Sequence, residues 1–137
     1  MGESKKHRIL VVEDDPAVLT TYRMLLEQQG YGVVSAESYD QAKRDLRDGK
    51  FDLLICDLSL EKQHSAFDVI DEARRSDPAM AAVVVTGYAS ADEVERAEQS
   101  GVRVLLKPIE IQEFLSTISN ALPKAYAHNQ KAKLKDA

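Results

Sequence analysis

Cysteine is almost absent from this chain of 137 residues, in which Cys56 is the only one. A single cysteine excludes an internal disulfide and is typical of proteins from a reducing compartment. A chain of this length buries roughly 68% of its unfolded surface, so it can fold without disulfides or a structural metal. We therefore expect one cytoplasmic domain with Cys56 inert in its core.

Long hydrophobic runs are also missing. The basic segment Met1–Arg8 leads only into the short apolar stretch Ile9–Val12, which carboxylates then interrupt. That stretch is too short for a signal peptide or a membrane span, so we expect no membrane contact.

The chain has no excess of positive charge and no glycine-rich loop. Its formal net charge of −5 lacks the electrostatic footprint of a nucleic-acid-binding protein. No glycine-rich phosphate loop follows the first apolar run, which argues against a nucleotide-binding enzyme. The spacing of His7, His64 and His128 matches no zinc pattern.

Five short apolar runs, most of them rich in leucine or β-branched residues, are present instead. Their continuous apolar character is typical of strands buried on both faces of a parallel sheet. The predicted strands are Ile9–Val12, Gly32–Ala36, Leu53–Cys56, Ala81–Val85 and Val102–Leu106.

Segments with helical periodicity lie between and after these runs. Three of them begin with capping signals, and Gly30 is a stop signal for the first. The start signals are Asp15 followed by Pro16, Ser38 with Gln41, and Ser90 with Glu93. Strand and helix thus alternate five times, which predicts a doubly wound α/β fold: a parallel sheet between two layers of helices. The fourth helix has only Val94 and Ala97 as apolar anchors, so we expect it to be the most mobile.

Chemically active side chains follow four of the five predicted strands. In open α/β sheets, ligands bind beyond the carboxyl ends of the strands, so these side chains should converge there. They are Glu13, Asp14 and Asp15 after the first strand, Asp57 after the third, Thr86 after the fourth and Lys107 after the fifth. Each residue alone has an ordinary structural explanation, and Asp15 before Pro16 is best explained as a helix cap.

Clustered carboxylates need a cation. Two of them about 4 Å apart repel by roughly 4 kcal/mol at an effective dielectric of 20, so the cluster either takes up protons or binds a metal. Oxygen ligands favour Mg²⁺, and a metal beside a carboxylate suits phosphoryl transfer onto Asp57. The hydroxyl of Thr86 and the ammonium of Lys107 could then hold phosphate oxygens.

Four ordered motifs carry a resemblance to a known family. They are Ile9–Asp15, Phe51–Leu58, Val83–Tyr88 and Leu105–Pro108. Residues 6–122 of the chain resemble the receiver domain of bacterial two-component response regulators. The resemblance implies a flavodoxin-like (βα)₅ three-layer sandwich with strand order 2-1-3-4-5.

The resemblance also implies roles for individual residues. Asp57 would be the phosphoacceptor, and Thr86 and Lys107 would contact the phosphoryl group. Mg²⁺ would be held by Glu13, mostly through water, and by Asp14, Asp57 and the backbone carbonyl of Ser59. Ser59 and Tyr88 would occupy the two positions that tune the lifetime of the phosphoryl group.

The same resemblance implies partners and domain limits. A histidine kinase or phosphotransfer protein would supply the phosphoryl group and dock on the first helix and the loop after the fifth strand. A homodimer would form through the fourth helix, fifth strand and fifth helix. The chain would be a signalling switch, not a metabolic enzyme. It would comprise an extension at 1–7, the receiver domain at 8–122 and a helix extension or linker at 123–137.

The chain departs from the family pattern in two places. Glu61 and Ala66 replace the usual proline and glycine, and the loop 59–66 is one residue longer than usual. Val104 replaces the aromatic switch residue, so the usual inward turn of an aromatic ring cannot operate there.

Three functions therefore remain to be distinguished. They are a receiver switched by phosphorylation, a receiver-like interaction domain that signals without phosphate, and an unrelated α/β enzyme or nucleotide binder. The motif set favours the first. The chain is either a single-domain regulator or one domain of a longer regulator or hybrid kinase.

Overall fold

A five-stranded parallel sheet forms the centre of the molecule in the computed structural model, which describes residues 6–123. The strand order is β2-β1-β3-β4-β5, as expected. The strands are β1 (Arg8–Val12), β2 (Gly32–Ala36), β3 (Leu53–Asp57), β4 (Ala81–Thr86) and β5 (Arg103–Leu106). The helices are α1 (Pro16–Gln28), α2 (Tyr39–Asp48), α3 (Ala66–Ser76), α4 (Ala91–Gln99) and α5 (Ile111–Ala121).

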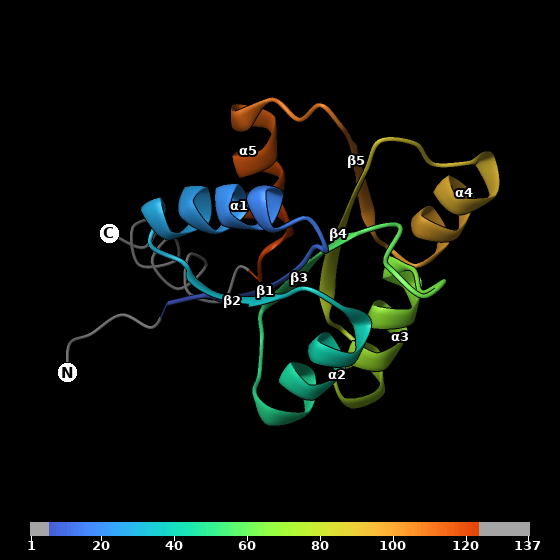
Figure 1. Cartoon of the computed structure of the whole chain (residues 1–137), viewed down its shortest axis with the longest axis horizontal. Coiled ribbons are helices and arrows are strands. Elements are labelled where there is room, and N and C mark those ends of the chain that lie inside the picture. The colour runs from blue at the N-terminus through green and yellow to red at the C-terminus, as the bar shows by residue number, and fades with distance from the viewer. Residues whose placement is uncertain (1–5, 124–137) are drawn as a thin grey trace, which may run out of the picture.

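The helices cover the sheet on both sides. Helices α1 and α5 lie on one face, and α2, α3 and α4 lie toward the other (Figure 1). Alternate residues of the central strands enter the two cores: Ile55 packs with the α1–α5 side, and Leu54 and Cys56 with the α2–α3 side. The rings of Tyr22 and Phe114 stack at 5.0 Å between α1 and α5. This three-layer sandwich confirms the predicted fold class.

Most helix ends follow the sequence signals. Asp15 caps α1 by accepting hydrogen bonds from the backbone N–H groups of Ala17 and Val18. Gly30 follows this helix at a φ of +90°, a left-handed conformation that glycine adopts without steric cost. The N–H groups of Gly30 and Tyr31 donate to the last turn, so the helix ends in a Schellman motif.

The second helix differs from its expected capping box. Ser38 accepts a hydrogen bond from the N–H of Gln41, as predicted, but the Gln41 side chain accepts from the N–H of Glu37. Its amide also donates to the carbonyl of Ser35, so this side chain ties α2 to the end of β2. The box at Ser90 and Glu93 forms in full.

Helix α4 is thinly anchored, because Ala97 is its only buried residue. Two arginines supplement this contact. Arg96 lies over the ring of Phe67 on α3, with 4.3 Å between guanidinium and ring centre. Arg74 of α3 donates to the carbonyl of Ser100 at the end of α4 at 2.8 Å.

The sandwich begins with the first strand and ends with the last helix. Residues from Arg8 at the start of β1 to Leu122 at the C-cap of α5 form the sandwich. The expected extensions at 1–7 and 123–137 fall almost wholly outside the described residues. Within residues 6–123, no helix has the length and apolar character needed to span a membrane.

Candidate functional site

Three carboxylates meet at the carboxyl edge of the sheet. Strands β1 and β3 are parallel neighbours, with Val12 paired to Cys56. The residues that continue these strands, Glu13 and Asp14 from β1 and Asp57 from β3, are therefore brought together. One carboxylate oxygen from each lies within 4.8 Å of the others. The sequence prediction of an acidic cluster is borne out, and Asp15 stays outside it as a helix cap.

Lys107 reaches into this cluster from the far side of β4. Its ammonium nitrogen lies 3.1 Å from Oδ2 of Asp57 and 3.5 Å from Oε1 of Glu13. Burial alone would lower the pKa of Lys107, but the hydrogen bond to Asp57 and the two negative charges outweigh it, so the pKa is raised. The ammonium is therefore positively charged at neutral pH and offsets part of the acidic charge.

Glu13 is the most enclosed of the three acids, with only 2% of its surface exposed. Burial raises the pKa of its carboxyl to about 7, reinforced by the charge of Asp57 and opposed by the N–H of Asp15 and by Lys107. The N–H of Asp15 donates to Oε2 of Glu13 at 3.1 Å. In the absence of a metal, this carboxyl therefore holds a proton through much of the acidic range.

Asp57 is fixed through both of its oxygens. Oδ2 accepts from Lys107, and Oδ1 accepts a 3.1 Å hydrogen bond from the backbone N–H of Ser59. The side chain is 13% exposed, so it is held in place yet open to an incoming group.

Thr86 lies at the end of β4, and its hydroxyl is engaged in the turn that follows. The hydroxyl donates to the carbonyl of Tyr88 at 2.9 Å and accepts from the N–H of Tyr88 at 3.3 Å. The Tyr88 side chain is 75% exposed. The carbonyl of Thr86 also accepts from the N–H of Lys107 at 2.7 Å, which links the two predicted phosphoryl contacts through the backbone.

Val104 occupies the position of the expected switch residue. It pairs with Val84 in the sheet, and its half-buried side chain packs against the core on the side of α2, α3 and α4. Its role in switching stays a prediction. The exposed Leu106, two residues on, turns to the surface.

The loop after β3 is a small hairpin that sequence reasoning did not find. Ser59 and Ser65 form an antiparallel bridge, and Lys62 and Gln63 at the tip have φ values of 60° and 65°. Two successive left-handed residues are typical of a type I′ turn, which normally selects asparagine and glycine. The Lys62-Gln63 pair therefore gave no turn signal.

The hairpin leads directly into a capping box that was also missed. Ser65 accepts from the N–H of Phe67 and Asp68 accepts from the N–H of Ser65, so α3 begins at a fixed point. A serine followed three residues later by an acid is the signal that could have found this helix start.

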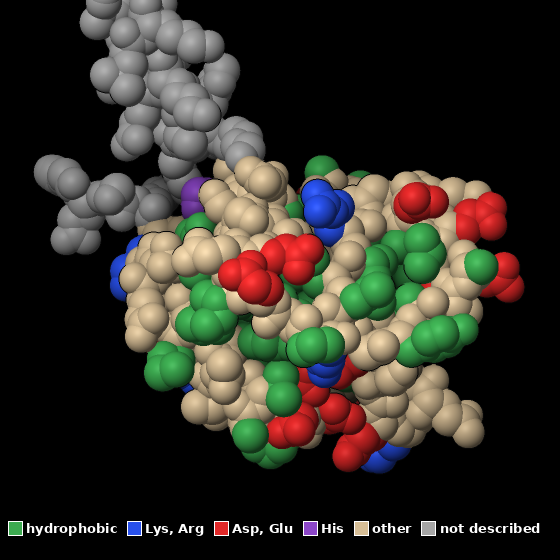
Figure 2. Space-filling view, turned by 90° about the horizontal axis from the view of Figure 1, so that it is seen from above, with side chains coloured by type: hydrophobic (Ala, Val, Ile, Leu, Met, Phe, Trp, Pro, Cys, Tyr) green, Lys and Arg blue, Asp and Glu red, His purple; other side chains and the backbone are tan. Residues whose placement is uncertain are grey.

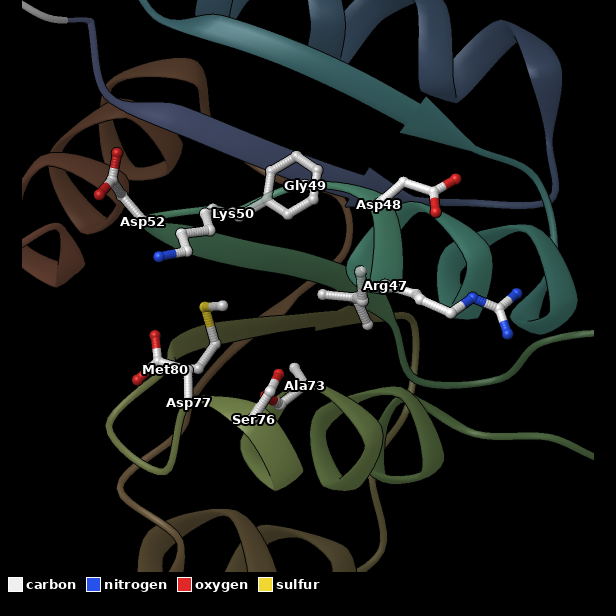
Figure 3. A pocket seen from close by; sticks show the side chains of 11 residues that line it. Arg47, Asp48, Gly49, Lys50, Asp52, Ala73, Ser76, Asp77 and Met80 are labelled. Carbon is white, nitrogen blue, oxygen red and sulfur yellow. The ribbon is translucent and has the colours of Figure 1, made fainter.

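A cavity of about 570 Å³ lies elsewhere, between the ends of α2 and α3. Asp52, just before β3, and Met80, just before β4, both line it (Figure 3). It is therefore at the amino edge of the sheet, opposite Asp57. Its walls include Arg47, Lys50 and Asp77 and do not include any of the clustered acids.

The sequence that forms this site matches a known protein family. Residues 9–119 match the model of the response regulator receiver domain. The chain belongs to this family. A receiver domain takes a phosphoryl group on an aspartate as a step of a phosphorelay, and the acidic cluster around Asp57 is consistent with that function.

Curated relatives of this receiver domain are transcriptional regulators. The alginate biosynthesis transcriptional regulatory protein AlgB of Pseudomonas aeruginosa is 40% identical over 105 residues, which cover 76% of this chain and 23% of AlgB. The chain thus spans about a quarter of the length of the curated relatives it matches.

Solved receiver domains share the fold. A response regulator receiver domain from Clostridium thermocellum superposes with a TM-score of 0.78 at 29% identity, covering 93% of this chain and 98% of that one. The beryllofluoride-activated NtrC4 receiver domain dimer gives a TM-score of 0.77 at 27% identity, covering 84% and 95%.

Proposed function

We propose that Asp57 is the phosphoacceptor of this receiver domain. The observation that carries the proposal is the position of its carboxylate, held by Lys107 and the N–H of Ser59 beside two further acids. A carboxylate oxygen of Asp57 attacks phosphorus, the phosphorus–nitrogen bond of the donor phosphohistidine breaks, and the imidazole leaves with a proton from solvent. The product is an acyl phosphate on Asp57.

The acidic cluster fits a magnesium ion. Asp14, Asp57 and the backbone carbonyl of Ser59 would bind it directly, and Glu13 mostly through water. These are hard oxygen donors, and the three carboxylates outnumber the single ammonium of Lys107. When bound, the ion neutralises charge on the phosphoryl oxygens.

Thr86 and Lys107 would hold the phosphoryl group. Lys107 already pairs with Asp57, and its ammonium can move onto a phosphoryl oxygen while staying near the carboxylate. Thr86 must give up its bond to the carbonyl of Tyr88 before its hydroxyl can donate to a phosphoryl oxygen. The turn after β4 would change with it, which offers a readout that needs no aromatic ring at Val104.

The further partners follow from the receiver assignment. The family implies a histidine kinase or phosphotransfer protein as donor. We propose that this donor docks on α1 and the loop after β5 in the cytoplasm, and that the chain acts as a switch without metabolic turnover. Ser59 and Tyr88 remain the candidates for tuning phosphoryl lifetime.

A homodimer through α4, β5 and α5 is a second part of the proposal. Exposed apolar side chains lie on this face at Val94, Leu106 and Ile111. Carboxylates lie on the same elements, and the view over the top of the molecule shows green and red side chains on one face (Figure 2). The acids of α4 and the start of α5 are Asp92, Glu93, Glu95, Glu98, Glu110 and Glu113. Apolar contact would therefore have to overcome like-charge repulsion.

The test of the phosphoacceptor is the mass of the intact protein after incubation with acetyl phosphate, with and without Mg²⁺. We expect one added phosphoryl group that depends on Mg²⁺ and on Asp57. Asp57→Asn should add none, whereas the matched control Asp71→Asn, on the exposed side of α3, should be labelled like the wild type. Equal labelling of Asp57→Asn would place the acceptor elsewhere, and an unlabelled wild type would favour a receiver-like domain that signals without phosphate.

A further inference from the structure

The hairpin after β3 carries the proposed metal ligand Ser59, and its second strand contacts α2 through His64. The imidazole of His64 stacks on the ring of Tyr39 with 4.1 Å between ring centres and 17° between the planes. Tyr39 is the first residue of α2, immediately after its N-cap Ser38. This stack joins the loop of the candidate site to the first turn of α2.

His64 makes two further contacts that hold the same segment. Its Nδ1 lies 3.4 Å from Oδ2 of Asp68, the acid that closes the capping box at the start of α3. Its carbonyl accepts from the N–H of Leu60 at 2.9 Å, across the hairpin. One residue therefore connects the hairpin to α2, to α3 and to its own opposite strand.

The tip of the hairpin needs such support. Lys62 and Gln63 both lie in the left-handed region, which side-chain-bearing residues rarely adopt in succession. Glu61, Lys62 and Gln63 are all exposed, so the core does not hold them in place. Leu60 anchors the first strand of the hairpin in the core, and His64 anchors the second strand against Tyr39.

The hairpin is short, so a contact that holds His64 in place also limits the movement of Ser59. Ser59 pairs with Ser65, the residue after His64, and the N–H of Ser59 donates to Asp57. The N–H of Ala66 also donates to the carbonyl of Leu58, which closes the base of the hairpin. A displacement at His64 therefore reaches the Ser59 peptide through one bridge.

We propose that His64 and Tyr39 form a clamp that positions the Ser59 carbonyl for Mg²⁺, which makes both of them positioning residues for the phosphorylation reaction. The proposal rests on the metal site of the proposed function. In this chain the clamp takes over the task of holding the loop, where Glu61 and Ala66 stand in place of the residues that the family pattern predicts.

The test measures Mg²⁺ affinity directly by titration calorimetry on the full chain, alongside thermal unfolding. We expect His64→Ala and Tyr39→Ala each to raise the Kd for Mg²⁺ about tenfold, since each removes the same stack. The double variant should be no worse than either single one, because the two residues act as a unit. Tyr39→Phe keeps the stacked ring and should bind Mg²⁺ within twofold of the wild type.

A suppressor separates positioning from general destabilisation. In the His64→Ala background, Lys62→Asn with Gln63→Gly supplies the pair that a type I′ turn prefers. If the clamp acts by holding the turn, these changes should recover most of the lost Mg²⁺ affinity. In acetyl phosphate labelling, His64→Ala should need more Mg²⁺ for half-maximal rate yet reach a near-normal rate at saturation.

The results separate this inference from the proposed function. If the wild type binds Mg²⁺ and His64→Ala binds it equally well, the clamp is overturned while the phosphoacceptor proposal stands. Lost affinity that the suppressor fails to restore would also overturn it, since the turn would not be what the clamp holds. A wild type that binds no Mg²⁺ would overturn both.

Discussion

The ammonium of Lys107 lies 3.1 Å from the carboxylate of Asp57, although Asp57 ends β3 and Lys107 follows β5, with β4 between these strands. The pair crosses the end of the central sheet and places a fixed positive charge where a phosphoryl group would arrive. Removing it would leave three acids facing one another.

Lys107→Ala should destabilise the metal-free protein at pH 8. The loss in the free energy of unfolding should be about 1 kcal/mol, because the variant loses a partly buried charge-assisted hydrogen bond. Urea denaturation with and without Mg²⁺ measures this, and saturating Mg²⁺ should shrink the difference. An undiminished difference in Mg²⁺ would contradict a shared site for ammonium and metal.

The stability of the metal-free protein should fall as pH rises through the range of Glu13. Its pKa is raised from 4.5 to about 7 on folding, so between these values the folded state binds more protons than the unfolded state. The free energy of unfolding therefore decreases across this window. At pH 8 the ionised Glu13 lowers the free energy of unfolding by about 3 kcal/mol.

Glu13→Gln isolates that contribution. The amide cannot ionise, so the variant should gain stability over the wild type at pH 8 and lose most of the advantage at pH 5. Denaturation midpoints at both pH values in EDTA provide the measurement. Equal stability gains at pH 5 and pH 8 would mean that the Glu13 carboxyl does not titrate as described.

Asp14 and Asp15 are adjacent acids, but substitution by asparagine should change the stabilisation by Mg²⁺ only at Asp14. Asp14→Asn should remove most of the rise in melting temperature that we expect Mg²⁺ to cause in the wild type, because a proposed metal ligand is lost. Asp15→Asn should keep that rise, since asparagine caps helices as well as aspartate does. Thermal unfolding over a Mg²⁺ series would show the contrast, and identical responses would remove Asp14 from the ligand set.

Helix α4 should be the first helix to open. It buries only Ala97, whereas α5 buries Phe114, Thr117 and Ile118. Amide hydrogen exchange should therefore be fastest in α4, and Arg74→Met should speed it further by removing the bond to Ser100. Protection of α4 equal to that of α5 would contradict this expectation.

Dimerisation through the α4–β5–α5 face should strengthen with salt. Acids outnumber the basic Arg96 and Arg103 there, so screening should reduce the repulsion between two copies. Sedimentation of the beryllofluoride-treated protein at two NaCl concentrations tests this, with Leu106→Asp as the variant that should stay monomeric. A dimer that weakens with salt would place the contact on another face.

The sequence was enough to predict most of the fold and the acidic cluster at the carboxyl edge, because parallel strands bring their carboxyl ends together whatever the connecting helices do. Continuous apolar runs indicated where the strands lie. Glu13, Asp14 and Asp57 could then be identified as the acids that follow two of these runs. The Tyr39–His64 stack was beyond reach, since no periodicity links positions so far apart. The hairpin tip was missed because Lys62 and Gln63 are not turn-forming residues.

The capping of α2 shows the same limit on a smaller scale. Gln41 has the right spacing for a box with Ser38, yet its side chain finds closer partners at the end of β2. Local spacing predicts which hydrogen bonds are available, and the tertiary arrangement decides which of them forms.

The two edges of the sheet differ in what they carry. All the proposed phosphate and metal contacts lie at the carboxyl edge, while the 570 Å³ cavity and the turns that line it lie at the amino edge. A change at the exposed Lys50, in the turn between α2 and β3, would lie at the edge opposite the site. That turn is where an engineer could insert a reporter without touching the proposed phosphate and metal contacts.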